Sequence, residues 1–298
     1  MIGSMTIRFD SCTCALVVGA VLWAASAQAA TTIDPAHPYA YGANVGWVNF
    51  RGDVANGAVL GYAYCTGYVW SANCGWICLG NGPTNGWQYS NDSALDHGVN
   101  HDGQGRLSGY AYGANVGWIN FEQAQGLPKI DLLTGSLSGY AYGANIGWIS
   151  LSNAQAYVQT DTLAPGPDSD GDGIPDPWEY RMAGNTNALW GGGHDADGDG
   201  VPDVQEAGAD TDPLDDTSFL AITALQRLST TNRLTWTVEP TRFYRLEHTV
   251  ALTNGEPWPD SGLGQMIPDP GATMMRGVSD PASTTRFYRV KAIVPLSE

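Results

Sequence analysis

The 298-residue sequence has few charged side chains and very few basic ones. Charged residues make up 14% of the chain, and 13 Lys and Arg stand against 30 Asp and Glu, which gives a formal net charge of -17 at pH 7. A chain with this balance repels nucleic acid and anionic lipid. It also lacks the Gly-x-Ser-x-Gly, phosphate-loop and His-Glu-x-x-His motifs, whose spacing serves nucleophilic, nucleotide and zinc chemistry. We therefore expect a protein that is not an enzyme.

A membrane-spanning run is also missing, since such a helix needs about 20 apolar residues. An apolar stretch runs only from Cys14 to Ala25, and Ala27-Gln28-Ala29 then supplies small residues. This pattern is typical of a cleaved secretory signal peptide. We assign residues 1–29 to it and expect a secreted or cell-surface, extracellular protein.

Cysteine is scarce, because removal of the signal peptide leaves only Cys65, Cys74 and Cys78. Outside the cytoplasm such thiols can oxidise. We expect a Cys65–Cys74 disulfide, because the two positions in an apparent hairpin could face each other across strands. A zinc site is the alternative, although no fourth ligand lies nearby in the sequence.

Glycine, proline and aromatic residues are plentiful, with 38 Gly, 17 Pro, 11 Trp and 14 Tyr. This composition favours turns and β-sheets over helices. At roughly 100–200 residues per domain, the length predicts two or three modules. We place an aromatic repeat domain at 30–162, an acidic linker at 163–216 and a C-terminal module at 217–298.

Four copies of one aromatic motif occupy most of the repeat domain. The third reads GYAYGANVGWINF from Gly109 to Phe121, and the tryptophan of each copy is Trp47, Trp76, Trp118 or Trp148. Alternation within each copy predicts a β-hairpin. Because a lone hairpin is marginally stable, we expect stacked hairpins with the Tyr and Trp rings in a shared core.

The alternative is that exposed rings of the repeats bind carbohydrate, with Trp87 and Tyr89 as further exposed candidates. The motif resembles the GYAWGENIGWINF-type repeats of exported bacterial proteins, and this resemblance implies no activity.

The acidic linker carries most of the net charge, with 14 acidic residues and only Arg181 as a basic one between Asp168 and Asp216. Two 12-residue runs place carboxylates at positions 1, 3, 5, 9 and 12 and Gly at position 6, which is the spacing of a calcium-binding loop. A backbone carbonyl at position 7 completes the set. The predicted ligands are Asp168, Asp170, Asp172, Ile174, Asp176 and Glu179 in the first loop and Asp195, Asp197, Asp199, Val201, Asp203 and Glu206 in the second.

These loops differ from an EF-hand pair, because Pro175 and Pro202 occupy position 8, where an EF-hand uses a backbone N–H. A short helix is expected over 177–182, with proline at its start. The runs DSDGDGIPDPWE and DADGDGVPDVQEAGADTDPLD resemble the thrombospondin type-3 repeats of secreted bacterial proteins. That resemblance implies that the acidic positions bind Ca2+ and that the segment is a structural connector.

In the C-terminal module, short apolar runs separated by turn residues predict a small β-sandwich. The expected strands are 220–228, 233–238, 242–249, 273–278 and 286–294. Two near-copies, beginning at Arg242 and Arg286, predict core strands with exposed arginines; an acidic-glycan site on those arginines is the alternative. The module resembles the terminal β domains that follow such calcium repeats in exported bacterial proteins, which implies a role in retention at the cell surface.

Together these features predict a mainly β protein with hairpin repeats, a calcium-binding loop segment with short helices and a small β-sandwich. The function expected is that of a non-catalytic structural or adhesion protein that binds about two calcium ions. Its partner would be an envelope component or a polysaccharide, not nucleic acid or a membrane span. The alternatives are a carbohydrate-binding protein that uses the exposed aromatics, and a hydrolase whose site has none of the common motifs.

Overall fold

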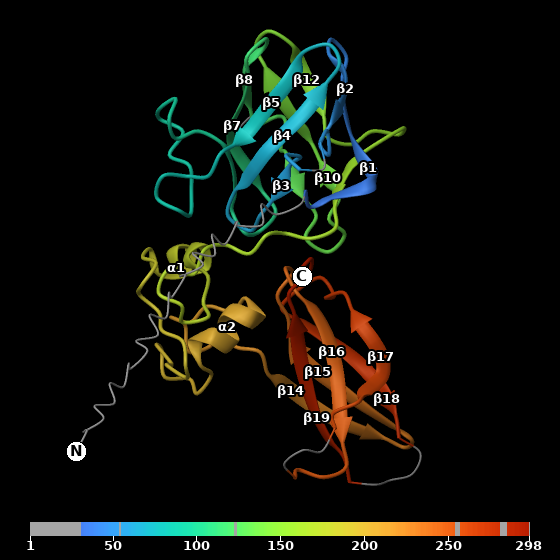
Figure 1. The fold of residues 1–298 in the computed structure, drawn as a ribbon. Coiled ribbons are helices and arrows are strands. Elements are labelled where there is room, and N and C mark those ends of the chain that lie inside the picture. The colour runs from blue at the N-terminus through green and yellow to red at the C-terminus, as the bar shows by residue number, and fades with distance from the viewer. Residues whose placement is uncertain (1–30, 54, 122–123, 254–256, 281–284, 298) are drawn as a thin grey trace, which may run out of the picture.

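The computed structural model describes residues 31–53, 55–121, 124–253, 257–280 and 285–297. The predicted signal peptide lies outside the described residues. The described chain is mainly β, as expected, with one large barrel-like sheet, smaller sheets and two short helices. In Figure 1 the large sheet lies at one end, the C-terminal sheets lie at the other, and the helical segment runs beside them.

The large sheet closes on itself because its first and last hairpins pair. Each copy of the aromatic motif forms one antiparallel hairpin, namely β1–β2, β4–β5, β7–β8 and β11–β12. The hairpins join edge to edge instead of stacking face to face, and β12 pairs back onto β1. These eight strands are β1 (Ile33–Gly42), β2 (Gly46–Asn49), β4 (Cys65–Ser71), β5 (Gly75–Gly80), β7 (Leu107–Gly113), β8 (Gly117–Asn120), β11 (Tyr140–Gly143) and β12 (Gly147–Ser150).

Short strands extend this sheet where the chain runs between hairpins. They are β3 (Val59–Leu60), which pairs with β4, β6 (Val99–His101), which pairs with β7, and β13 (Val158–Thr160), which pairs with β1. A separate two-stranded sheet consists of β9 (Lys129–Ile130) and β10 (Leu137–Ser138). This small sheet lies outside the large one.

Aliphatic side chains fill the inside of the barrel-like sheet. Val48, Ile77, Ile119 and Ile149 are almost fully buried, and the space among the inward residues has a volume of only about 10 Å³. An eight-stranded barrel is just wide enough inside for its own side chains. Alternation therefore sends the bulkier rings outward.

The expected aromatic core is consequently wrong. The four motif tryptophans are 41–49% exposed, and each lies against two rings of the preceding strand. We call these rings the aromatic belt. It consists of Tyr39, Tyr41, Trp47, Tyr68, Trp70, Trp76, Tyr110, Tyr112, Trp118, Tyr140, Tyr142 and Trp148.

The asparagine of each Gly-Ala-Asn or Ser-Ala-Asn turn joins its hairpin to the preceding one. Asn73 donates to the Val45 carbonyl, Asn115 to that of Cys74, and Asn145 to that of Val116, at 3.0–3.1 Å. Asn44 donates to the Ile146 carbonyl at 3.0 Å and completes the ring. The repeated asparagine thus satisfies a backbone acceptor at each junction between hairpins, a contact worth about 1 kcal/mol.

The expected Cys65–Cys74 disulfide is not formed, and Cys65, Cys74 and Cys78 are free thiols. Cys65 begins β4, whereas Cys74 lies in the turn after its far end. Six residue steps along a strand span roughly 20 Å, which is far beyond the Cα separation that a disulfide bridges. Strand β4 is longer than the predicted pairing of Cys65 with Cys74 requires.

The long loop of the second repeat also differs from expectation. Tyr89 is buried, and its hydroxyl donates to the Cys65 carbonyl at 3.1 Å. Gly80 and Gly98 leave room for its ring, because a Cβ at either position would lie within 2.5 Å of it. Tyr89 is therefore a packing residue and not an exposed candidate for ligand binding.

The C-terminal module contains two three-stranded antiparallel sheets. One has the order β14-β15-β18 and the other β17-β16-β19. One hydrophobic cluster draws residues from both, including Trp236, Leu246 and Met274. The sequence predicts every strand except β17, whose residues include two glycines and no β-branched side chain. The strands are β14 (Ile222–Leu228), β15 (Thr231–Thr237), β16 (Phe243–Thr249), β17 (Asp260–Met266), β18 (Thr273–Ser279) and β19 (Phe287–Ile293).

A pair of neighbouring substitutions tests which face of the sheet forms the core. We predict that Ile119→Gln lowers the free energy of unfolding by about 4 kcal/mol or more, because it buries an amide and removes apolar packing. Trp118→Gln leaves its amide in solvent, and we expect a loss of about 1–2 kcal/mol from cross-strand packing. Urea unfolding measures both. An equal or larger loss of unfolding free energy for Trp118→Gln would instead support a core formed by the aromatic rings.

Candidate metal centre

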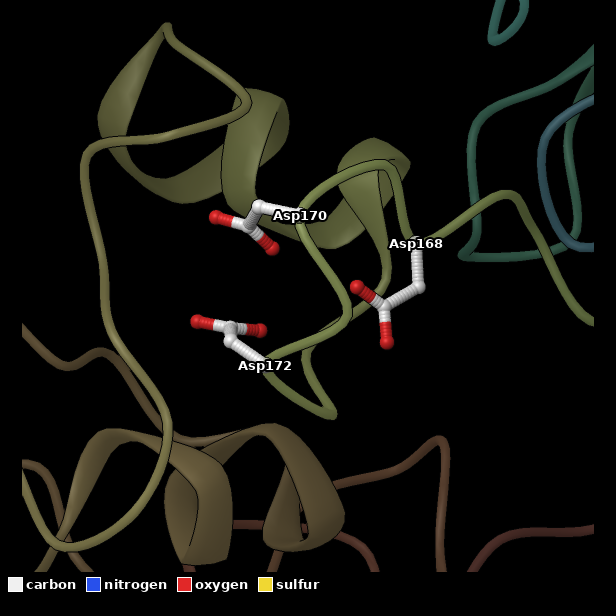
Figure 2. Close-up of side chains that lie close together, drawn as sticks. All are labelled: Asp168, Asp170 and Asp172. Carbon is white, nitrogen blue, oxygen red and sulfur yellow. The ribbon is translucent and has the colours of Figure 1, made fainter.

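Two aspartate triads lie in the acidic segment between the β modules. Asp168, Asp170 and Asp172 place one carboxylate oxygen each within 4.8 Å of one another, and Asp195, Asp197 and Asp199 do the same. Figure 2 shows the first triad on a single tight loop, with the Asp170 and Asp172 carboxylates on the same side of it. The structure thus brings together three of the four aspartates predicted as ligands in each loop.

The two loops have the same internal hydrogen bonds, 27 residues apart. Asp168 accepts from the backbone N–H groups of Gly171 and Gly173 at 2.8 and 3.1 Å, and Asp195 accepts from the equivalent glycines at 2.8 and 2.9 Å. Gly173 and Gly200 have φ angles of 95° and 96°, in a region that residues with a Cβ rarely adopt. The glycine at position 6 thus permits the turn that gathers the aspartates.

A short helix follows each loop and carries the glutamate of position 12. These helices are α1 (Asp176–Ala183) and α2 (Asp203–Ala209). The helix expected over 177–182 is confirmed as part of α1, which has proline near its start. Both Glu179 and Glu206 lie in the first turn of their helix.

Each of these glutamates is fully buried and keeps one oxygen without a partner. Glu179 Oε1 accepts from the Leu189 N–H, and Glu206 Oε1 accepts from the Thr211 hydroxyl. The other oxygen, Oε2, is buried with no hydrogen-bond partner in both residues. Burial, with added repulsion from neighbouring aspartates, raises the pKa of both glutamates to about 7. An unpartnered buried carboxylate oxygen is costly unless it meets a cation.

Asp176 and Asp203 differ from the other predicted ligands. Both carboxylate oxygens of Asp176 accept hydrogen bonds from Ser169. Those of Asp203 accept from Ala196, His194 and Trp190. At position 9 of each loop, these two aspartates therefore stabilise the loop conformation through hydrogen bonds.

Position 7 anchors the first loop through packing. The Ile174 side chain is fully buried beside Trp178 and Leu189. Val201, at the equivalent position of the second loop, is half-buried. The backbone carbonyls of Ile174 and Val201 remain the predicted ligands of this position.

The donor set of both loops consists of oxygen alone. Oxygen ligands suit hard cations such as Ca2+ and Mg2+, whereas zinc prefers nitrogen and sulfur. Asp197 and Asp199 each retain a buried Oδ2 without a partner, as does Glu206 with its Oε2 in the helix that follows. The residues therefore fit a metal ion, and a doubly charged cation would offset the repulsion among them.

Asp210 joins the acidic segment to the C-terminal module. It accepts hydrogen bonds from the Trp178 indole, from Arg181 and from the Thr241 hydroxyl. Arg242 lies 3.8 Å from it and donates to the carbonyls of Gly208 and Ala207. This role was not predicted, because Asp210 lies outside the 12-residue spacing and its partners are 29 to 32 residues away in the chain.

The arginines of the C-terminal near-copies are not a free basic surface. Arg242 is buried at the end of α2, which corrects the expectation that it is exposed. Arg286 lies 3.2 Å from Asp280, and Arg289 lies 2.7 Å from Glu247 and over the Trp258 ring. Arg245 lies 3.9 Å from Asp260. Each of these arginines therefore already faces a carboxylate of the protein.

The acidic segment also contacts the repeat domain. The Trp87 and Tyr180 rings lie 3.9 Å apart, which brings α1 against the long loop of the second repeat. The C-terminal tail makes a second connection, since Tyr62 donates to the Pro295 carbonyl and Leu296 packs against the core of the repeat domain. The two β modules are thus in direct contact, and the acidic segment is not their sole connection.

Compared with models of known families, with curated proteins and with solved structures, the chain matches none. Among the residues that the structure describes, no helix has the length and apolar character needed to cross a membrane.

The raised glutamate pKa values predict how pH affects the calcium-free segment. Since the folded pKa of about 7 exceeds the ordinary value of 4.5, this contribution to stability is complete below pH 4.5 and is lost as the pH rises through 7. Hydrogen exchange of residues 168–210 in chelator should therefore become faster beyond the intrinsic pH effect. Glu179→Gln with Glu206→Gln should remove this dependence, whereas the exposed Asp216→Asn should keep it. Equal pH dependence in all three proteins would contradict the assignment.

Proposed function

We propose that this protein is a non-catalytic, secreted or cell-surface structural protein whose acidic segment binds two calcium ions. The observation that carries the proposal is the repeated arrangement of an aspartate triad and a buried glutamate with one unpartnered oxygen. Calcium takes six to eight oxygens in flexible geometry, whereas magnesium demands a stricter octahedron. Two irregular, carboxylate-rich loops favour calcium. The extracellular assignment rests on the signal-peptide pattern in residues 1–29.

The proposed role of the ions is to fix a junction between the two β modules. Each loop leads directly into a helix whose first turn carries the glutamate. Helix α1 contacts the repeat domain through Tyr180, and Asp210, at the end of α2, contacts the C-terminal module through Thr241 and Arg242. Ions that hold the loops would therefore hold both contacts. We further propose that the two C-terminal sheets form a small β-sandwich that retains the protein on an envelope component or a polysaccharide.

Limited proteolysis tests this role. In calcium, we expect residues 163–216 to resist cleavage, because the ions hold the loops closed. In chelator, cleavage there should be at least about tenfold faster, since protease attack follows the population of the opened segment. Asp168→Ala with Asp195→Ala should be cleaved rapidly in both conditions, and Asp216→Asn should behave as the wild type. Equal cleavage of the wild type in calcium and in chelator would remove the proposal.

Solution scattering separates the ions from the second connection. Because the C-terminal tail also holds the modules together, chelation alone should change the radius of gyration only slightly. Leu296→Ser removes the apolar anchor of the tail. This variant should be compact in calcium and larger in chelator. Identical dimensions in both conditions would show that the ions do not orient the modules.

A further inference from the structure

We propose that the aromatic belt is a binding surface for neutral polysaccharide chains. This function goes beyond the calcium-dependent junction and is independent of it. The rings cover the outer face of the eight-stranded sheet, while aliphatic side chains fill its inside.

The same ring geometry occurs in all four hairpins. The directly opposed pairs are Tyr41–Trp47, Trp70–Trp76, Tyr112–Trp118 and Tyr142–Trp148, with ring centroids 4.8–5.0 Å apart and interplanar angles of 57–65°. Cross-strand packing of this kind stabilises a hairpin by only about 0.2–1 kcal/mol. Packing between the two rings of a pair still leaves apolar ring surface exposed in every hairpin. Large exposed apolar patches on a protein mark interaction sites.

Small polar side chains alternate with the rings around the belt. Asn49 lies opposite Trp70, Asn120 opposite Tyr142, and Ser150 opposite Tyr41. The second repeat departs from this pattern, because Cys78 lies opposite Tyr112. A ring bordered by amide or hydroxyl groups matches a sugar, which has an apolar C–H face and hydroxyl groups at its rim.

The scarcity of charged side chains in the strands of this face favours a neutral ligand. In the eight strands that form the closed sheet, the one acidic residue is Asp34 in β1, and none is Lys or Arg. Asp34 lies 2.7 Å from His37, whose ring stacks on Tyr157. The His97 ring, from the long loop of the second repeat, packs against Trp118 and Tyr112. Because the strands themselves carry no lysine or arginine, an anionic polymer or an anionic membrane has no basic partner among their side chains. A neutral sugar chain needs none.

The four repeats provide several contacts for one polymer. Each hairpin presents two or three rings, so a single site is expected to bind weakly, and several sites on one chain raise the effective affinity. The belt therefore suits a repetitive polysaccharide better than a small free sugar.

Binding to insoluble polymers tests the proposal. The probes are cellulose, chitin and starch granules, each in calcium and in chelator, with polygalacturonate beads and phosphatidylcholine vesicles as contrasting surfaces. We expect the wild type to bind at least one of the three neutral polymers, with the same affinity in calcium and chelator. It should not bind the anionic polymer or the vesicles.

Two double variants identify the surface. Trp47→Gln with Trp118→Gln, and Trp76→Gln with Trp148→Gln, should each reduce binding at least tenfold, because aromatic anchors dominate such contacts. The matched control is Trp190→Gln, which removes an exposed tryptophan of the acidic segment and should bind as the wild type. Circular dichroism and thermal melting establish that each variant is folded, and either double variant suffices if the other does not fold.

Three results would overturn the proposal. The first is failure of the wild type to bind any neutral polymer, and the second is binding to vesicles or polygalacturonate alone. The third is an equal loss in the Trp190→Gln control. Loss of binding in chelator alone would assign the surface to the calcium segment. Proteolysis of the acidic segment is measured separately. The polysaccharide proposal can therefore fail while the calcium proposal stands, and the calcium proposal can fail while the polysaccharide proposal stands.

Discussion

Repulsion among clustered carboxylates is the constraint on which the centre of this molecule depends. Ten of them occupy two short loops and the first turns of two helices, and two are fully buried glutamates. The helices also carry the contacts that join the β modules, through Tyr180 on one side and Asp210 on the other. The contacts that the acidic segment makes therefore depend on how this negative charge is offset, and the proposed pair of divalent cations would offset it.

In the repeat domain, the sequence pattern predicts the hairpins but not which of their faces forms the core. Alternation correctly predicts four hairpins, but it defines two faces without saying which is inside. The large rings suggested a core, whereas closure of the sheet leaves an interior that Ile119 and its aliphatic equivalents already fill. Closure depends on pairing between β1 and β12, more than one hundred residues apart. No local pattern contains that information.

The acidic segment was predictable where the sequence has a fixed local spacing. Both triads and the positive-φ glycines follow from the 12-residue pattern, and the proline at its start indicated the short helix after the first loop. The pattern did not show that the Asp176 and Asp203 carboxylates are engaged by their own loops. It also could not show the contacts of Asp210 with Thr241 or of Leu296 with the repeat domain, because these partners lie in other modules. Long-range contacts of this kind become visible only in the folded chain.

The most direct test of the central claim is to count the ions. Native mass spectrometry of the full-length protein after export, stripped with chelator and returned to calcium, should show two bound calcium ions per chain. Glu179→Gln should retain one ion, and Glu179→Gln with Glu206→Gln should retain none, since each loop depends on its own buried carboxylate. A wild type that binds no calcium, or a double variant that still binds two ions, would contradict the account.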